Sequence, residues 1–156
     1  RQIDAALLRA PVLGNLLQSL DTARFSRTLG TLLSSGVPLL SAIALAKGVI
    51  VNYILAAGID EVTQTLHRGG RMASALRLAT GFPARAAQLI EVGEESGQLP
   101  RMMEKVAENY DREVETTLKR LLTILEPALI LGLGGLIAVI IVSILVAILG
   151  LNELVV

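Results

Sequence analysis

The apolar residues of this chain recur at the spacing of a helix face, and near the C-terminus they merge into one unbroken apolar run. Most neighbours within each group lie three or four residues apart, which places the group on one side of a helix. The inward positions that we expect are Phe25, Leu29, Leu32 and Leu33; Leu39, Ile43, Ala46 and Ile50; Leu55, Ile59, Val62 and Leu66; Met72, Ala75, Leu76 and Ala79; Ala86, Leu89, Ile90 and Gly93; and Leu99, Met103, Val106, Tyr110, Val114, Leu118, Leu121 and Leu125. The pattern predicts an all-α fold, a six-helix antiparallel bundle followed by one C-terminal transmembrane helix.

Polar, glycine and proline residues mark the ends of the predicted helices. Asp21 suits the N-cap of the first helix, because a short acidic side chain accepts hydrogen bonds from free backbone amides. Gly36 suits the left-handed position that ends this helix, and Pro38 suits the first turn of the next one. Asn52 is expected to start the third helix, and Gly97 to close the fifth.

The C-terminal apolar run is long enough to cross a lipid bilayer. Residues 127–151 carry no charge, and at about 1.5 Å per residue a helix of this length extends over roughly 37 Å, against about 30 Å for the hydrocarbon core. A buried core helix is the alternative, but the rest of the chain is too small to cover it on every side. Pro127 is expected to kink the sixth helix or to begin a separate one, because it lacks a backbone donor.

These patterns divide the chain into four parts. They are a lead-in that is irregular or follows the membrane (1–20), a helical bundle (21–126), a transmembrane helix (127–151) and a short tail (152–156).

Positive charge lies on one side of the predicted span only. Arg112, Lys119 and Arg120 precede it, whereas the residues after it contain no Lys or Arg. Since positively charged flanks stay in the cytoplasm, the bundle is expected to be cytoplasmic and the tail to emerge on the opposite side.

Small residues recur within the predicted span. Ala128, Gly132 and Gly135 are spaced by four and three, a pattern that lets another helix approach closely. Glycine and alanine are also simply common in membrane helices, so both readings stand.

The amino-acid composition limits the functional classes that fit this chain. Hydrophobic residues make up 53% of the chain and the formal net charge is zero, which gives no basic footprint for nucleic acid. There is no cysteine, the lone His67 lies near a predicted helix end, and no phosphate-binding glycine loop occurs. We therefore expect no catalytic residue, no cofactor and no metal, and we expect the chain not to be an enzyme.

The segment from Val92 to Leu99, "VGEESGQL", carries a candidate polar contact. Glu94 is expected either to cap a neighbouring helix or to contact a partner protein. On the last helix, Glu108 and Arg112 lie among alternating charges that are typical of a solvated face, and that face is also a candidate contact for a cytoplasmic partner.

Three spaced blocks resemble a known family: "ARFSRTLGTLLSSGVPLLSAI", "FPARAAQLIEVGEESGQL" and "YDREVETTLKRLLTILEPALIL", followed by "LNELV". They resemble the C-terminal half of the inner-membrane platform protein F of bacterial type II secretion systems, which is homologous to the type IV pilus assembly platform. The matching motif positions are Arg24, Phe25, Gly36, Pro38, Gly93, Glu94, Gly97, Leu99, Glu126 and Pro127. The resemblance assigns these positions to fold and assembly, and the chain looks like a fragment that starts after a preceding span.

The resemblance implies a non-enzymatic role in the bacterial inner membrane, with a periplasmic C-terminus. The implied partners are the cytoplasmic secretion ATPase, other inner-membrane secretion components, a pseudopilin, further copies of the chain in a homo-oligomer, and membrane lipid. A type IV pilus platform and a membrane-anchored helical scaffold or sensor are the alternatives.

Overall fold

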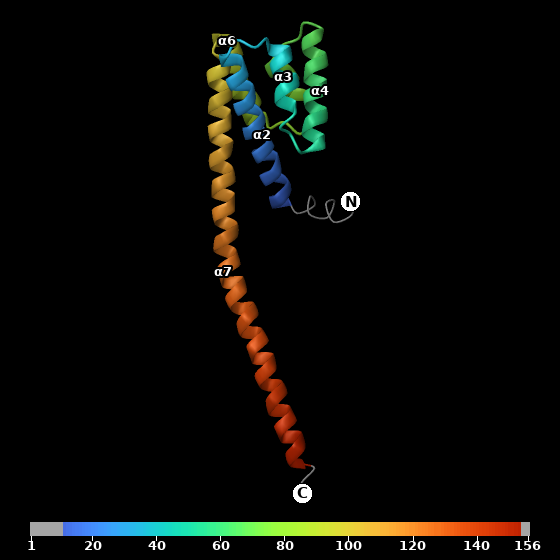
Figure 1. Cartoon of the computed structure of the whole chain (residues 1–156), viewed down its shortest axis with the longest axis vertical. Coiled ribbons are helices and arrows are strands. Elements are labelled where there is room, and N and C mark those ends of the chain that lie inside the picture. Colours follow the sequence, from blue (N-terminus) through green and yellow to red (C-terminus); the bar gives the residue numbers. More distant parts are fainter. Residues whose placement is uncertain (1–10, 154–156) are drawn as a thin grey trace. The chain divides into compact units, whose positions relative to one another are not determined.

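The computed structural model describes residues 11–153, which are helical apart from short loops (Figure 1). Residues 1–10 of the predicted lead-in and 154–156 of the predicted tail lie outside the described residues. The helices are α2 (Pro11–Ser34), α3 (Leu39–Lys47), α4 (Tyr53–His67), α5 (Met72–Leu78), α6 (Ala84–Ser96) and α7 (Leu99–Glu153). The all-α prediction is confirmed, and the described residues contain six helices, of which the last is long and largely apolar.

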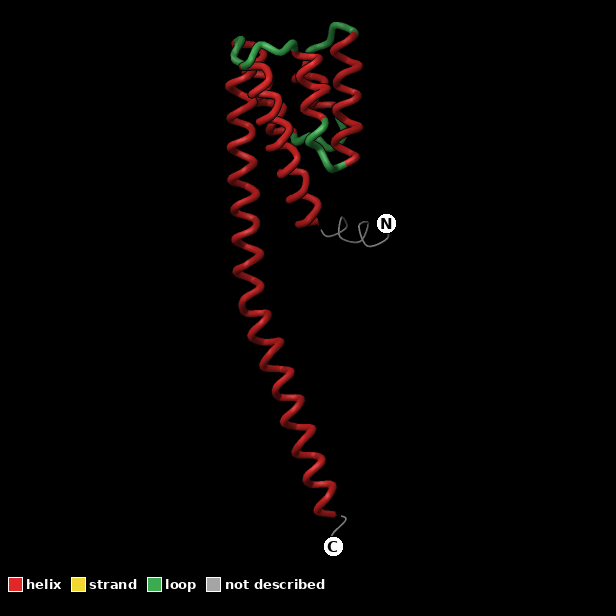
Figure 2. Tube along the Cα trace, viewed as in Figure 1, coloured by secondary structure: helices red, strands yellow, loops and turns green. Residues whose placement is uncertain are grey.

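The chain forms two compact units, unit 1 up to Glu115 and unit 2 from Thr116 onward. Within unit 1, helices that follow one another in sequence pack together: α2 against α3, α3 against α4, α4 against α5, and α5 against α6. Its loops gather at the two ends of the helices (Figure 2). The loops are also short, so most of each helix face is available for packing.

The predicted inward faces meet in one core in unit 1, except at the end of the last pattern, where the prediction is wrong: Leu118 and Leu125 lie in unit 2 and are exposed. The aromatic centre is an edge-to-face pair of Phe25 and Phe82, with ring centroids 6.4 Å apart. The largest fully buried side chains are Phe25, Leu29, Ile43, Leu55, Ile59, Val62, Met72, Leu76, Ile90, Met103 and Val106. Because these residues come from every helix, removal of apolar surface from water holds the six segments together.

The helix ends follow the sequence signals at three places. Gly36 has a φ of 85°, and the amides of Gly36 and Val37 donate to the carbonyl oxygens of Leu33 and Leu32, which closes α2 in the expected left-handed turn. Asn52 is the N-cap of α4, and its side chain accepts from the amide of Ile54. Gly97, with a φ of 71°, ends α6.

The prediction that Asp21 starts the first helix is wrong. Asp21 lies inside α2, which begins at Pro11, and the residue is only 3% exposed. Its Oδ2 instead accepts hydrogen bonds from the amides of Val51 at 3.0 Å and Asn52 at 2.7 Å. The carboxylate does satisfy free amides ahead of a helix, but the helix is α4, thirty residues further along the chain.

Pro127 does not begin a separate helix, because α7 is continuous from Leu99 to Glu153 with the proline inside it. A proline costs a helix the donor to the carbonyl four residues earlier, here that of Thr123. The backbone on both sides of Pro127 stays helical, so one missing hydrogen-bond donor does not end the helix. The first turn of α3 differs by one position, since Pro38 precedes the helix as its N-cap.

Unit 2 contains the rest of α7. Among the described residues, α7 is the one helix long and apolar enough to cross a membrane, and none of its most apolar stretch is buried within the protein. The large apolar side chains from Leu129 to Leu151 are all at least 49% exposed. Within unit 2, this stretch therefore buries none of its apolar surface.

Candidate functional site

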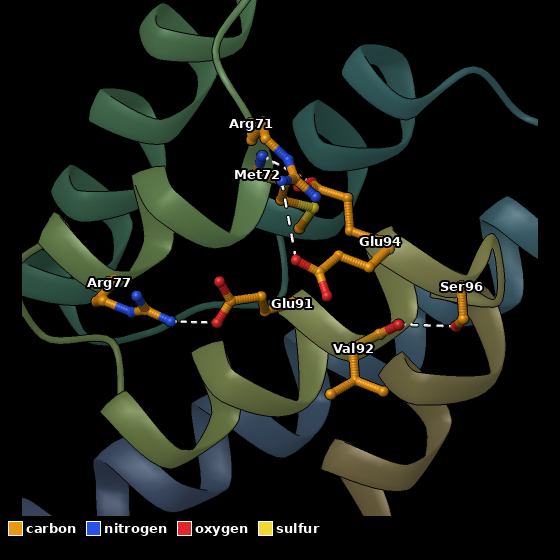
Figure 3. Close-up of polar contacts among 8 residues, drawn as sticks. Arg71, Met72, Arg77, Glu91, Val92, Glu94 and Ser96 are labelled. Atoms are coloured by element: carbon orange, nitrogen blue, oxygen red, sulfur yellow. Dashed lines mark hydrogen bonds and ion pairs between the residues drawn. The ribbon is translucent and has the colours of Figure 1, made fainter.

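Glu94 on α6 forms the centre of a polar network with the start of α5 (Figure 3). Its Oε2 accepts from the amide of Met72 at 2.8 Å, and its Oε1 accepts from Nε of Arg71 at 2.9 Å. The residue at the N-cap position of α5 makes no side-chain cap of its own. Glu94 therefore supplies from another helix the acceptor that the free amides at the start of α5 need.

A second carboxylate on α6, one turn earlier, holds the other end of α5. Glu91 pairs with Arg77, which lies in the last turn of α5 (Figure 3). Because the two glutamates are three residues apart, they lie on the same side of α6. The two links fix a helix of only seven residues at both ends.

Gly93 lies at a close approach of α6 to α7. A Cβ atom at this position would lie 2.7 Å from Cβ of Met102 and 3.2 Å from Cα of Leu99. The amide of Gln98 also donates to the carbonyl of Gly93 at 2.8 Å, which completes the turn around Gly97. Glycine is required at 93 for close packing and favoured at 97 for a positive φ.

A polar cluster that the sequence patterns did not predict joins α2, α6 and α7. Glu113 accepts from Nη2 of Arg85 and from the hydroxyl of Ser19, both at 3.3 Å. Tyr110 is 6% exposed beside it, and burial raises the pKa of its phenol while the guanidinium of Arg85 partly opposes the rise. Arg85, Tyr110 and Glu113 line an open cavity of about 410 Å³, together with Gln88, Leu89, Val92 and Asn109.

The sequence signal for this cluster is weak. Tyr110 was placed on the inner face of the last helix, but Ser19, Arg85 and Glu113 come from segments up to 94 residues apart. Helical spacing predicts which residues lie on the same face of one helix. It does not predict which side chains contact each other across different helices.

The proposed contact residues of α7 are accessible. Glu108 and Arg112 are exposed, and Glu108 lines a shallow cavity with Arg27, Thr31 and Glu104. Arg27 itself pairs with Asp111. Glu94 differs from the other two candidates, because only 19% of its side chain is exposed and both its oxygens already have partners.

The remaining positions noted in the sequence fall in several environments. Arg24 is exposed, Phe25 is fully buried, and Leu99 packs partly buried against the core. Glu126 and Pro127 are exposed on α7 in unit 2, as are Ala128, Gly132 and Gly135. The structure brings Glu94 next to the amide of Met72 and Gly93 next to Met102, and among the described residues a Cβ atom at Gly132 or Gly135 would have no neighbour within 4 Å.

The described residues contain no group of three or more His, Asp or Glu side chains placed to hold a metal ion. The polar contacts of unit 1 are instead ion pairs and helix caps, and such contacts position helices. The phenol of Tyr110 is protonated at neutral pH, and its raised pKa keeps it protonated to a higher pH than an exposed tyrosine.

Comparison with known proteins decides the family. Residues 25–147 match the family described as type II secretion system (T2SS), protein F. The chain belongs to this family. The resemblance predicted from the three sequence blocks is thereby confirmed, and protein F is a structural component of the secretion machinery that has no enzymatic activity.

Individual relatives come from both the secretion and the pilus branch. Type II secretion system protein F of Aeromonas hydrophila is 40% identical over 149 residues, covering 96% of this chain and 38% of the relative. Its counterpart in Pseudomonas aeruginosa is 36% identical, covering 96% and 37%. The type IV pilus assembly protein PilC of Pseudomonas aeruginosa is 32% identical, covering 98% and 41%. The chain therefore spans well under half the length of these relatives.

Proposed function

We propose that this chain is part of an inner-membrane platform of a type II secretion system. Its cytoplasmic six-helix antiparallel bundle, expected at residues 21–126, begins with α2 at Pro11. Residues 127–151 are its transmembrane helix and residues 152–156 a periplasmic tail. The platform couples the cytoplasmic secretion ATPase to the assembly of a pseudopilin and is not itself an enzyme. Its further partners are other inner-membrane secretion components, membrane lipid and other copies of itself.

One observation carries this proposal: α7 has an unbroken helical backbone from the core residue Met103 to the apolar residues after Pro127. Residues 103–127 contain no glycine and no serine, the residues that make flexible linkers. A continuous helix transmits displacement better than a coil does. The family match over residues 25–147 points to a secretion machinery in which transmitting a displacement along α7 would have a use.

The proposed orientation rests on charge. Arg112, Lys119 and Arg120 precede the uncharged stretch, and no Lys or Arg follows it. Because positively charged flanks stay in the cytoplasm, we expect unit 1 to lie on the same side of the membrane as the ATPase. The C-terminus is then expected in the periplasm.

Insertion of a flexible linker tests the coupling. Seven Gly and Ser residues inserted directly before Pro127 should abolish secretion and leave the thermal unfolding of unit 1 unchanged. The matched control is seven helix-forming residues at the same place, because seven residues make about two turns and nearly preserve the helical phase. Secretion should survive the helical insertion to a much greater degree. Equal secretion with both insertions would refute coupling through a continuous helix.

The contact surface on α7 can be tested by crosslinking in cells. Photoreactive residues at Glu108 and Arg112 should capture a cytoplasmic partner, and the same probe at exposed Ser74 on α5 serves as a control for another face. Glu94 is proposed mainly as a helix cap, because its carboxylate is already occupied by Arg71 and Met72. Capture of the same proteins from all three exposed positions would show that this face of α7 has no special role.

The pilus branch is the second candidate, because PilC of Pseudomonas aeruginosa aligns with 98% of this chain. Deletion in the source cell separates the two: loss of protein secretion with intact pili supports the secretion platform.

A passive membrane anchor makes a different prediction, since it would tolerate replacement of residues 127–151 by an unrelated transmembrane helix. The platform is expected to fail with that replacement and with Gly132→Leu or Gly135→Leu.

A further inference from the structure

A polar contact among three helices lies where α7 leaves unit 1. Tyr110 is the last buried residue in the described part of α7, and Glu113 lies three residues later on the same side, two residues before unit 1 ends at Glu115. The Oε1 atom of Glu113 accepts from the hydroxyl of Ser19 on α2, and its Oε2 accepts from Nη2 of Arg85 on α6, both at 3.3 Å. We call these two contacts the exit clamp.

The exit clamp contributes little to the stability of unit 1. The side chain of Arg85 is 81% exposed and that of Glu113 is 43% exposed. Exposed ion pairs are weakened by water and by the ordering of two long side chains, so they add little to the free energy of unfolding. All the buried residues in the described part of α7 precede the clamp. A contribution to folding therefore does not account for a three-helix contact at this place.

Two open cavities adjoin the exit clamp. One has a volume of about 410 Å³ and the other about 220 Å³, and Arg85, Tyr110 and Glu113 line both of them. Ser19 lines the smaller cavity. Because open space adjoins the turn of α7 that carries Glu113, apolar packing does not fix this turn by itself. Its position depends on polar contacts instead.

A second ion pair in the same turn shows what the exit clamp adds. Arg27 on α2 pairs with Asp111 on α7, and this pair joins α7 to α2 alone. The phenol of Tyr110 interacts with the guanidinium of Arg85, near the start of α6. Glu113 extends this contact with α6 by about one turn and joins it to α2. A helix held by one neighbour can roll or pivot, whereas contacts with two neighbours define its rotation as well as its location.

We propose that the exit clamp fixes α7 to unit 1, so that a displacement of unit 1 is passed to α7 at its exit. Glu113 and Arg85 are positioning residues in this transmission. The inference rests on the coupling function proposed above, and it adds the residues through which the bundle holds the transmitting helix. Loss of the clamp leaves unit 1 folded and α7 helical, but it lets the last packed turn of α7 move.

Charge inversion tests the exit clamp, because Arg85→Glu places a second carboxylate beside Glu113. Amide hydrogen exchange of the full chain in detergent should become several-fold faster in residues 107–115, where it reports local opening. Secretion by cells whose platform carries the variant should fall several-fold. The double variant Arg85→Glu with Glu113→Arg restores an ion pair of reversed polarity, and it should recover both the slow exchange and the secretion.

Lys47→Glu is the matched control. It makes the same change of charge beside Asp60, in an exposed pair that joins α3 to α4. Exchange in residues 107–115 and secretion should both stay as in the parent chain. Glu113→Gln is a milder variant of nearly the same shape that introduces no like-charge repulsion. It should change exchange and secretion in the same direction as Arg85→Glu, but by less.

The outcomes separate the exit clamp from the coupling function. Unchanged exchange in Arg85→Glu would show that the clamp does not hold α7, and faster exchange with full secretion would show that it passes on no motion. Either result overturns the inference, as does a loss of secretion that the double variant does not recover or that Lys47→Glu shares. The coupling function fails on a different result, namely continued secretion by cells that lack the whole chain.

Discussion

Asp21 shows how a single buried carboxylate organises unit 1 across distant segments. It is 3% exposed inside α2, and its Oδ2 holds the amides of Val51 and Asn52 in the connection that leads into α4. Asn52 in turn caps α4 through the amide of Ile54. Two short polar side chains thus satisfy three amides at the start of one helix, and the connection is tied to α2 through charge-assisted hydrogen bonds.

Asp21→Ala is expected to destabilise unit 1 by about 1–3 kcal/mol, because it leaves two partly buried amides without an acceptor. Denaturant unfolding of the detergent-solubilised chain, followed by circular dichroism, measures the change. The matched control is Asp60→Ala, which removes an exposed ion pair to Lys47 and should cost about 0–1 kcal/mol. Equal losses for the two variants would mean that the Asp21 contacts contribute no more than a surface pair.

Gly93→Ala is expected to destabilise unit 1 even though alanine favours a helix by about 1 kcal/mol over glycine. The new Cβ would lie 2.7 Å from Cβ of Met102 and 3.2 Å from the Cα of Leu99, so α6 and α7 must separate. Overpacking of this kind costs about 1–3 kcal/mol. Ser74→Ala, at an exposed position of α5, adds helix propensity without a close contact and should be slightly stabilising. A rise in the unfolding midpoint of Gly93→Ala would contradict the close contact.

At the scale of elements, α6 is the helix that positions its neighbours. Glu91 and Glu94 hold the two ends of α5, Gly93 admits α7, and Ala86 and Ile90 are buried in the core. The short helix α5 has no side-chain cap of its own, so its start depends on a glutamate from another element. The location of α5 is therefore set by tertiary contacts as much as by local sequence.

The sequence predicted most elements because their signals are local. Helical spacing located the core faces, and Gly36, Asn52 and Gly97 acted at their own helix ends. Asp21 has the same local signature as an N-cap, and only the packing of α2 against the α3–α4 connection shows that it caps a different helix. Glu113, Arg85 and Ser19 could not be paired from spacing, because their contacts join three helices.

Tyr110 gives the packing of α6 against α7 a pH dependence. Burial raises the pKa of its phenol above the ordinary value of 10.0, and the Arg85 guanidinium partly opposes this. The fold thus favours the neutral phenol, and its contribution to stability is complete below pH 10 and is lost as pH rises through the folded-state pKa. Tyr110→Phe should therefore lose less stability than the parent chain between pH 9 and 12, as measured by thermal unfolding.

Tyr53→Phe is the control for this pH series, because Tyr53 is 73% exposed and outside the core. Its unfolding midpoint should follow the parent chain across the same pH range. If Tyr110→Phe also follows the parent chain, the ionisation of Tyr110 is not linked to folding.

At the scale of the whole molecule, one helix passes between two environments. The part of α7 in unit 1 buries Met103, Val106 and Tyr110, whereas the large apolar residues described after Pro127 are exposed. Composition and length predicted the span, and the orientation remains a prediction from three positive charges. A membrane-impermeant label can test that orientation, since unit 1 and the C-terminal end should lie on opposite sides of the bilayer.

Single cysteines make this test clean, because the chain contains none. Ser74→Cys reports on exposed α5, and Asn152→Cys reports on the exposed end of α7. In sealed inside-out vesicles an impermeant maleimide should label Ser74→Cys and spare Asn152→Cys until detergent is added. Spheroplasts should give the reverse, because their outer surface is the periplasmic side. Labelling of both positions in intact inside-out vesicles would mean that α7 does not span, and the opposite pattern would place unit 1 in the periplasm, away from any cytoplasmic ATPase.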